Sequence, residues 1–222
     1  MKKTLLLITF VLGGAFSALA MPVACTSESL ADYEALTAGC TIGDITFDDF
    51  QYTPTSFMGA PVPPAGSVMV NPQTGTEAGF EFVAGWSAGA GQFEDSLITY
   101  TATCMGCLLD DWVLQTGGAG SAGLAADGVV NVTETSSQIP GALTQVTVGA
   151  GPVTGVGSAT FPPVASVTVS KDIFVYGASA LSTQVSSVTN LFSSIATPEP
   201  SLLILCAGFL GLVPVARRKF GL

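Results

Sequence analysis

The stretch Phe80-Glu81-Phe82-Val83-Ala84-Gly85-Trp86 decides the fold class of this chain. Phe80, Phe82 and Trp86 alternate with Glu81 and Val83 along it. Such alternation is typical of a β-strand with one buried face, because successive side chains in a strand point to opposite sides. The stretch therefore predicts a strand that contributes its large apolar side chains to a core.

The same period of two recurs along the chain, at Ile45/Phe47, Val129–Thr133, Val146/Val148, Val167/Val169 and Ile173/Val175. Proline- and glycine-rich breakers separate these runs, at 61–64, 116–123, 149–157 and 161–163. Many short strands with such turns predict an all-β fold, a single antiparallel β-sandwich of jelly-roll-like type over roughly residues 43–192. Residues 182–192 have mixed spacing, so that both a strand and a linker stay open there.

The first twenty residues have the pattern of a secretory signal peptide. Lys2 and Lys3 precede the apolar run 5–16, and Ala18-Leu19-Ala20 provides a small-residue cleavage site for signal peptidase. A permanent membrane anchor is the alternative, but the run is shorter than the ~20 residues that a spanning helix needs. We therefore expect residues 1–20 to direct export and to be removed.

A second apolar segment lies near the other end. Residues 202–216 carry no charge and are followed by Arg217-Arg218-Lys219. As a helix they would measure about 22 Å, which is short for a hydrocarbon core of ~30 Å. Basic residues stay on the cytoplasmic side, so residues 21–197 would lie outside the inner membrane. A plain tail anchor with a C-terminal hydrophobic helix is the simplest interpretation of this segment.

Pro198-Glu199-Pro200, the apolar run and the end Arg217-Arg218-Lys219 together resemble the PEP-CTERM sorting signal. The resemblance implies that an exosortase cleaves near residues 198–200 and passes the protein to the cell surface or an exopolysaccharide biofilm matrix. It divides the chain into a signal peptide (1–20), an exported domain (21–196) and a sorting signal (197–222).

Other segments are similar to those of exported PEP-CTERM proteins of acidobacteria, namely 25–44, 86–89, 95–96 and 169–173. This likeness extends the resemblance over most of the chain. It supports export and a single fold, and it transfers no active site.

The charge balance excludes several functions. The chain has no histidine, which excludes histidine-based triads and imidazole metal sites. Residues 21–197 hold fifteen acidic residues against one base, Lys171, a net charge of −14. That sign disfavours nucleic acid and favours divalent cations or basic partners. Salt bridges cannot hold such a fold together, so apolar packing, backbone hydrogen bonds and cysteines must do so.

Four cysteines remain in the exported part, and their even number predicts two disulfides in an oxidising compartment. Three connectivities are open, and proximity in sequence favours Cys25–Cys40 and Cys104–Cys107. The first bridge would clip a short N-terminal helix with Ser27 as N-cap and Gly39 after its end.

The second pair is a C-x-x-C sequence with Met105-Gly106 between two strand-like runs. We expect a turn whose Gly106 adopts a positive φ, with the disulfide closing the end of a β-hairpin. A redox motif would instead stand at a helix N-terminus, and a zinc site disagrees with the wide separation of the two pairs.

Candidate catalytic residues are scarce. The pairs Asp48-Asp49, Glu94-Asp95 and Asp110-Asp111 cannot each form a glycosidase dyad, because neighbours in a strand point to opposite faces. We therefore expect no enzymatic activity and no cofactor. Calcium is a weak alternative use for the acidic residues, with Asp44, Asp110 and Asp111 as the first candidates.

Trp86 and Trp112 have two interpretations. Exposed indoles would suit the flat faces of sugars, whereas the strand-like surroundings of each favour a place in the core. Two function classes follow from the sequence. The first is a non-enzymatic structural or adhesion protein of the surface or matrix, and the alternative is an extracellular carbohydrate-binding or carbohydrate-active module.

Overall fold

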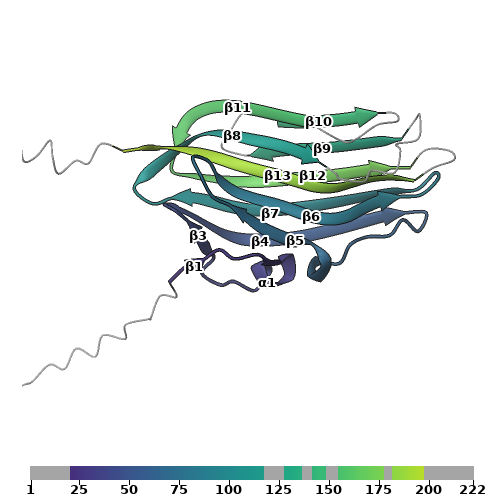
Figure 1. The fold of residues 1–222 in the computed structure, drawn as a ribbon, viewed down its shortest axis with the longest axis horizontal. Helices are drawn as coiled ribbons and strands as arrows, with labels where there is room; N and C mark the ends of the chain where they lie inside the picture. Colours follow the sequence, from purple (N-terminus) through teal and green to yellow (C-terminus); the bar gives the residue numbers. More distant parts are fainter. Residues whose placement is uncertain (1–20, 118–127, 137–141, 149–154, 178–181, 198–222) are drawn as a thin grey trace, which may run out of the picture.

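The chain folds as a sandwich of two β-sheets (Figure 1). The computed structural model describes residues 21–117, 128–136, 142–148, 155–177 and 182–197. The strands are β1 Val23–Ala24, β2 Glu28–Ser29, β3 Cys40–Ile42, β4 Ile45–Phe57, β5 Met69–Gln73, β6 Ala78–Ala88, β7 Phe93–Cys104, β8 Cys107–Gly117, β9 Val129–Ser136, β10 Ala142–Val148, β11 Gly155–Val164, β12 Ser166–Tyr176 and β13 Thr183–Ala196. A short helix, α1 Leu30–Glu34, and a 3₁₀ turn, η1 Ala65–Ser67, complete the described elements.

The seven-stranded sheet has the order β1-β3-β4-β7-β12-β9-β10, and the six-stranded sheet the order β11-β8-β13-β6-β5-β2. The pairs are antiparallel except for β1 with β3. The chain changes sheet at most of its connections, so that strands of both sheets alternate along the sequence. The predicted antiparallel β-sandwich is therefore confirmed.

The core lies between the two sheets and follows the alternation seen in the sequence. Phe80, Phe82 and Trp86 of β6 are fully buried, whereas Glu81 and Val83 are only partly covered. Aromatic rings from both sheets meet edge to face, including Phe47 with Phe80 at 4.7 Å between centroids. This ring packing contributes to the burial that a domain with a single base in residues 21–197 needs.

Helix α1 covers the edge of the core beside β4. Its N-cap is Ser29, whose hydroxyl accepts from the Asp32 N–H in a capping box, and not Ser27 as predicted. Ser29 is favoured as N-cap because Asp32, three residues later, accepts a hydrogen bond from the Ser29 backbone N–H. The expected disulfide Cys25–Cys40 is present, with the two Cα atoms 4.9 Å apart.

The disulfide Cys104–Cys107 is also present, and Gly106 has a φ of 81°. The prediction of a β-hairpin at this turn is wrong, because β7 belongs to the seven-stranded sheet and β8 to the six-stranded sheet. The sequence Met105-Gly106 therefore turns the chain from one sheet into the other. The disulfide joins the two sheets at a corner of the sandwich.

Two further boundaries differ from expectation. The run Phe161-Pro162-Pro163 was expected to break a strand but lies inside β11. The strand tolerates its prolines because β11 is an edge strand and its register with β8 shifts between Thr160 and Val164. The ambiguous residues 182–192 form a strand, since β13 continues to Ala196 as a central strand of its sheet.

The predicted signal peptide (1–20) and, apart from Thr197, the predicted sorting signal (197–222) lie outside the described residues. Within the described part of the chain, no helix is long and apolar enough to cross a membrane.

Candidate functional site

Of the three acidic pairs, Glu94-Asp95 places its two neighbouring carboxylates on opposite sides of a strand, whereas Asp48-Asp49 and Asp110-Asp111 lie at register shifts of β4 and β8. Glu94 is fully buried in the core side of β7, whereas Asp95 lies on the outer face. Asp111 accepts a hydrogen bond from the Ser193 N–H at 3.0 Å, next to a register shift between β13 and β8. That contact gives Asp111 a structural role in the sheet.

The calcium candidates do not come together. Asp44 lies in the exposed turn between β3 and β4, where its carbonyl accepts from the Met105 N–H. Asp110 and Asp111 lie on β8. Among the described residues no three acidic, cysteine or histidine side chains gather as a metal site. The processing residues Pro198, Glu199, Pro200, Arg217, Arg218 and Lys219 lie outside the described residues.

Both tryptophans belong to the core. Trp86 has no exposed surface, and Trp112 has 1%. Trp112 packs edge to face against Phe161, with 6.4 Å between the ring centroids. The core interpretation is confirmed, and neither indole is available as a platform for sugars.

A different set of aromatic rings lies on the outer face of the seven-stranded sheet. Phe57 of β4 stacks on Phe93 of β7, with the centroids 4.9 Å apart and the planes 9° apart. Phe93 in turn approaches Phe174 of β12 at 5.8 Å. Phe57 is 52% exposed. We call these three residues the aromatic strip.

Two carboxyl groups lie beside the aromatic strip. Asp95 stands opposite Phe174 in the register of β7 and β12, and Asp172 precedes Phe174 by two residues on the same face. Partial burial raises the pKa of Asp172 to about 7, and a hydrogen bond with Asp95 and its negative charge add to the shift. Asp172 therefore keeps its proton to a higher pH than an exposed aspartate does.

A second polar group lies inside the sandwich. Lys171 of β12 and Glu134 of β9 are cross-strand partners, and their Nζ and Oε2 atoms lie 2.5 Å apart without any exposed surface. Burial lowers the Lys171 pKa against the opposing effect of Glu134. Burial likewise raises the Glu134 pKa, while Lys171 and the Asn190 side chain lower it. Desolvation thus favours the neutral forms of both groups.

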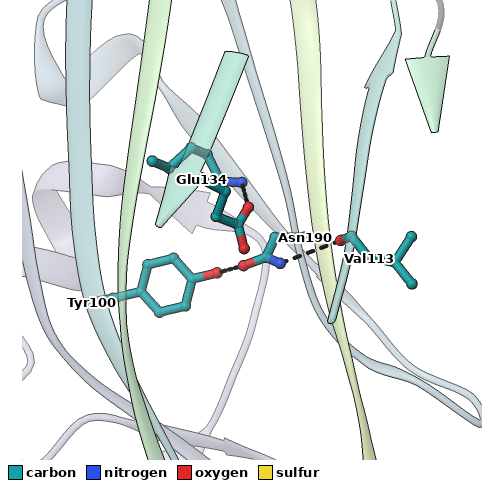
Figure 2. Close-up of polar contacts among 5 residues, drawn as sticks. Tyr100, Val113, Glu134 and Asn190 are labelled. Atoms are coloured by element: carbon teal, nitrogen blue, oxygen red, sulfur yellow. Dashed lines mark hydrogen bonds and ion pairs between the residues drawn. The ribbon is translucent and has the colours of Figure 1, made fainter. Parts of the chain in front are cut away.

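The amide of Asn190 connects this ion pair to the opposite sheet. Figure 2 shows Tyr100, Glu134 and Asn190 converging, with the Tyr100 hydroxyl donating to Asn190 Oδ1. Asn190 Nδ2 donates to the Val113 carbonyl at 3.3 Å. Burial, with the Glu134 charge, raises the Tyr100 pKa well above its usual value, so that the phenol keeps its proton. We call Tyr100, Glu134, Lys171 and Asn190 the buried cluster.

No protein-family model matches the chain, and no curated protein matches it. Among solved structures, TmCBM61 in complex with β-1,4-galactotriose is 7% identical, with a TM-score of 0.31 over 63% of this chain and 86% of that one. Tailspike protein 4 of bacteriophage CBA120 is 10% identical, with a TM-score of 0.27 over 70% of this chain and 20% of that one. The family 11 carbohydrate-binding module from Clostridium thermocellum is 9% identical, with a TM-score of 0.21 over 79% and 99%. Because all three TM-scores are below 0.5, we infer nothing about this chain from these similarities.

Sequence reasoning missed both the aromatic strip and the buried cluster. The three phenylalanines come from three strands that are far apart in sequence. The sequence showed that Lys171 is the single base of the exported part, but it did not lead us to expect that this side chain is buried. The one sign of burial was that Lys171 stands between Val169 and Ile173, on the inward-facing positions of the alternation.

Proposed function

We propose that residues 21–197 form an exported, non-enzymatic surface or matrix protein that binds polysaccharide through the aromatic strip. The observation that carries this proposal is the stacked, solvent-facing arrangement of Phe57, Phe93 and Phe174. These rings contribute nothing to the core between the sheets, and Phe57 remains half exposed. An exposed aromatic patch on a soluble domain commonly marks a binding surface.

The chemistry of the strip and its surroundings suits a sugar chain. The faces of aromatic rings offer flat apolar surface on which the C–H face of a pyranose can pack. Asp95 and Asp172 lie beside the rings and provide carboxyl oxygens that accept hydrogen bonds from sugar hydroxyls. A flat strip on a sheet fits a continuous chain of sugars better than an isolated small molecule, which prefers a concave pocket.

Export is the second part of the proposal. The chain ends support it, with signal-peptide character at 1–20 and a PEP-CTERM-like signal at 197–222. The two disulfides also suit an oxidising compartment outside the cytoplasm. The protein would cross the inner membrane, meet signal peptidase and an exosortase, and reach the surface or the exopolysaccharide after tail removal.

Glycan-array binding and affinity electrophoresis in polysaccharide-containing gels test the binding. We expect Phe57→Ala and Phe174→Ala to lose at least tenfold in affinity while the melting temperature changes little. The control is Val156→Ala, because Val156 is 69% exposed on β11 of the other sheet. Binding to no glycan, or equal binding by all three variants, would overturn the glycan proposal, and sugar release from a bound chain would overturn the non-enzymatic part.

Intact mass of the protein from whole cells and from medium tests the sorting. We expect a species that begins near Met21 and ends near Pro198. A full-length C-terminus retained in the inner membrane would contradict exosortase processing and leave a tail-anchored domain.

A further inference from the structure

The single base of the exported domain is in an unusual place for its charge. Lys171 is the only basic residue among fifteen acidic ones in residues 21–197, and none of its surface is exposed. Lysine is almost never fully buried unless it is paired, as Lys171 is with Glu134, and a buried ion pair seldom stabilises a fold more than well-packed apolar residues would. The buried amine therefore calls for a role other than stabilisation by charge.

The surroundings of this amine contain the groups that amide chemistry needs. The Lys171 amine lies 2.5 Å from Glu134, and the Asn190 side chain lies beside the same carboxyl (Figure 2). Lys171 belongs to the seven-stranded sheet, whereas Asn190 reaches in from β13 of the six-stranded sheet. Figure 2 shows the carboxyl of Glu134 and the hydroxyl of Tyr100 on the side of Asn190 that faces the core.

We infer that Lys171 and Asn190 join in an intramolecular isopeptide bond, with Glu134 transferring the protons and Tyr100 stabilising the oxyanion. This bond would connect β12 to β13 and thus tie the two sheets together through the core. It needs no metal, cofactor or outside reactant. It is also independent of glycan binding, since the buried cluster and the aromatic strip lie on opposite faces of the seven-stranded sheet.

The step balances as follows. The Lys171 ammonium gives a proton to the Glu134 carboxylate, and the free amine attacks Cγ of Asn190 to form the Nζ–Cγ bond. Negative charge develops on Oδ1, where the Tyr100 hydroxyl donates. Glu134 then protonates Nδ2, the Cγ–Nδ2 bond breaks and ammonia leaves. The new amide loses its extra proton to Glu134, which ends as a neutral carboxylic acid.

The environment favours each part of this reaction. Burial lowers the pKa of Lys171 and raises that of Glu134, which favours the neutral amine that attacks. Ile98, Val132 and Ile173 surround the pair and are fully buried, so that water is excluded from the reacting groups. The donation of Asn190 Nδ2 to the Val113 carbonyl fixes the orientation of the amide. The reactants are therefore held together before the bond forms.

Intact mass spectrometry of the reduced, denatured exported protein tests the inference. We expect a mass lower than that of the linear chain by one ammonia, and a crosslinked peptide that contains Lys171 and Asn190. Trypsin offers a second readout, because Lys171 is its only cleavage position within residues 21–197. An acylated Nζ would block that cleavage even in the denatured chain.

Three variants sharpen the test. Glu134→Gln should restore the full linear mass and the tryptic cleavage after Lys171. Tyr100→Phe should slow the formation of the bond, and it is the variant to use if Glu134→Gln does not fold. Asn190→Asp should give the same crosslinked peptide with loss of one water instead of ammonia. The matched control Asn131→Asp, on the outer face of β9, should leave the ammonia loss intact.

Several results would overturn the inference. A wild-type protein of full linear mass that trypsin cleaves after Lys171 would exclude the bond. Loss of one water from the wild-type chain, with a peptide joining Lys171 to Glu134, would exclude Asn190 as the partner. An undiminished crosslink in Glu134→Gln would exclude the role of that carboxyl.

Discussion

The stability of this protein should fall as the pH rises from about 5 to about 8, and Glu94 is the main cause. Its carboxyl is fully buried on the core side of β7, where the Ser96 hydroxyl donates to Oε1. Burial raises the Glu94 pKa from 4.5 to about 7 despite that hydrogen bond, and the charge of Asp95 adds to the rise. The folded protein thus holds the Glu94 proton more tightly than the unfolded chain does.

The sign and size of the effect follow from this difference in proton affinity. A raised pKa of an acid contributes stability that is complete below the unfolded pKa and is lost as the pH rises through the folded pKa. For Glu94 the window runs from 4.5 to about 7. At 1.36 kcal/mol per pKa unit, this rise corresponds to about 3 kcal/mol of unfolding free energy, most of which should disappear across the window. Asp172, whose pKa is also raised to about 7, acts in the same direction.

Urea unfolding at about pH 5 and about pH 8 measures this loss, with Glu94→Gln as the test variant. Because glutamine cannot ionise, the variant should lose less stability than the wild type between the two pH values. Glu81→Gln is the matched control, since Glu81 lies on the outer face of β6 and is only half-buried. Equal pH dependence of Glu94→Gln and the wild type would refute the reasoning, because the desolvated carboxyl would then not be the source.

Three further predictions concern packing and the backbone. Trp112→Ala should cost about 3–5 kcal/mol of unfolding free energy in urea, since its indole is buried, and a cost below about 1 kcal/mol would show that the site is not tightly packed. Replacing both Cys25 and Cys40 by serine should cost about 3 kcal/mol, as expected for their separation of 15 residues, and an unchanged melting temperature would disprove the contribution of this bridge. Gly39→Ala should destabilise more than Gly43→Ala in thermal melting. Both positions have positive φ, but only at Gly39 would the new Cβ lie 2.2 Å from a backbone oxygen, so equal losses would contradict that close approach.

The fold class was predictable because burial and the period of two agree along the chain. Phe80, Phe82 and Trp86 point inward as their spacing indicates, and Val167 and Val169 do the same on β12. The two disulfide pairs followed from proximity in sequence. In each case the information lies within a few residues of the feature it predicts.

The candidate sites were not predictable for the opposite reason. Phe57, Phe93 and Phe174 become neighbours only through the register of three strands that no local pattern specifies. Lys171 and Asn190 meet only because the two sheets pack face to face. The sheet change at Met105–Gly106 has the same origin, since a two-residue turn between strands fits a hairpin equally well until strand pairing is known.

The disulfide Cys104–Cys107 and the aromatic strip lie at opposite ends of β7. Ala196 of β13 pairs with Cys107, so the described chain ends at the corner that Cys104–Cys107 closes, and Figure 1 shows β13 leaving the sandwich on that side. The aromatic strip lies at the other end, because Phe93 begins β7 and Cys104 ends it. Phe93 and Cys104 are eleven positions apart along the strand, about 37 Å at 3.4 Å per residue. Any partner joined to the C-terminal end of the described chain would therefore lie about a full domain length away from the aromatic strip.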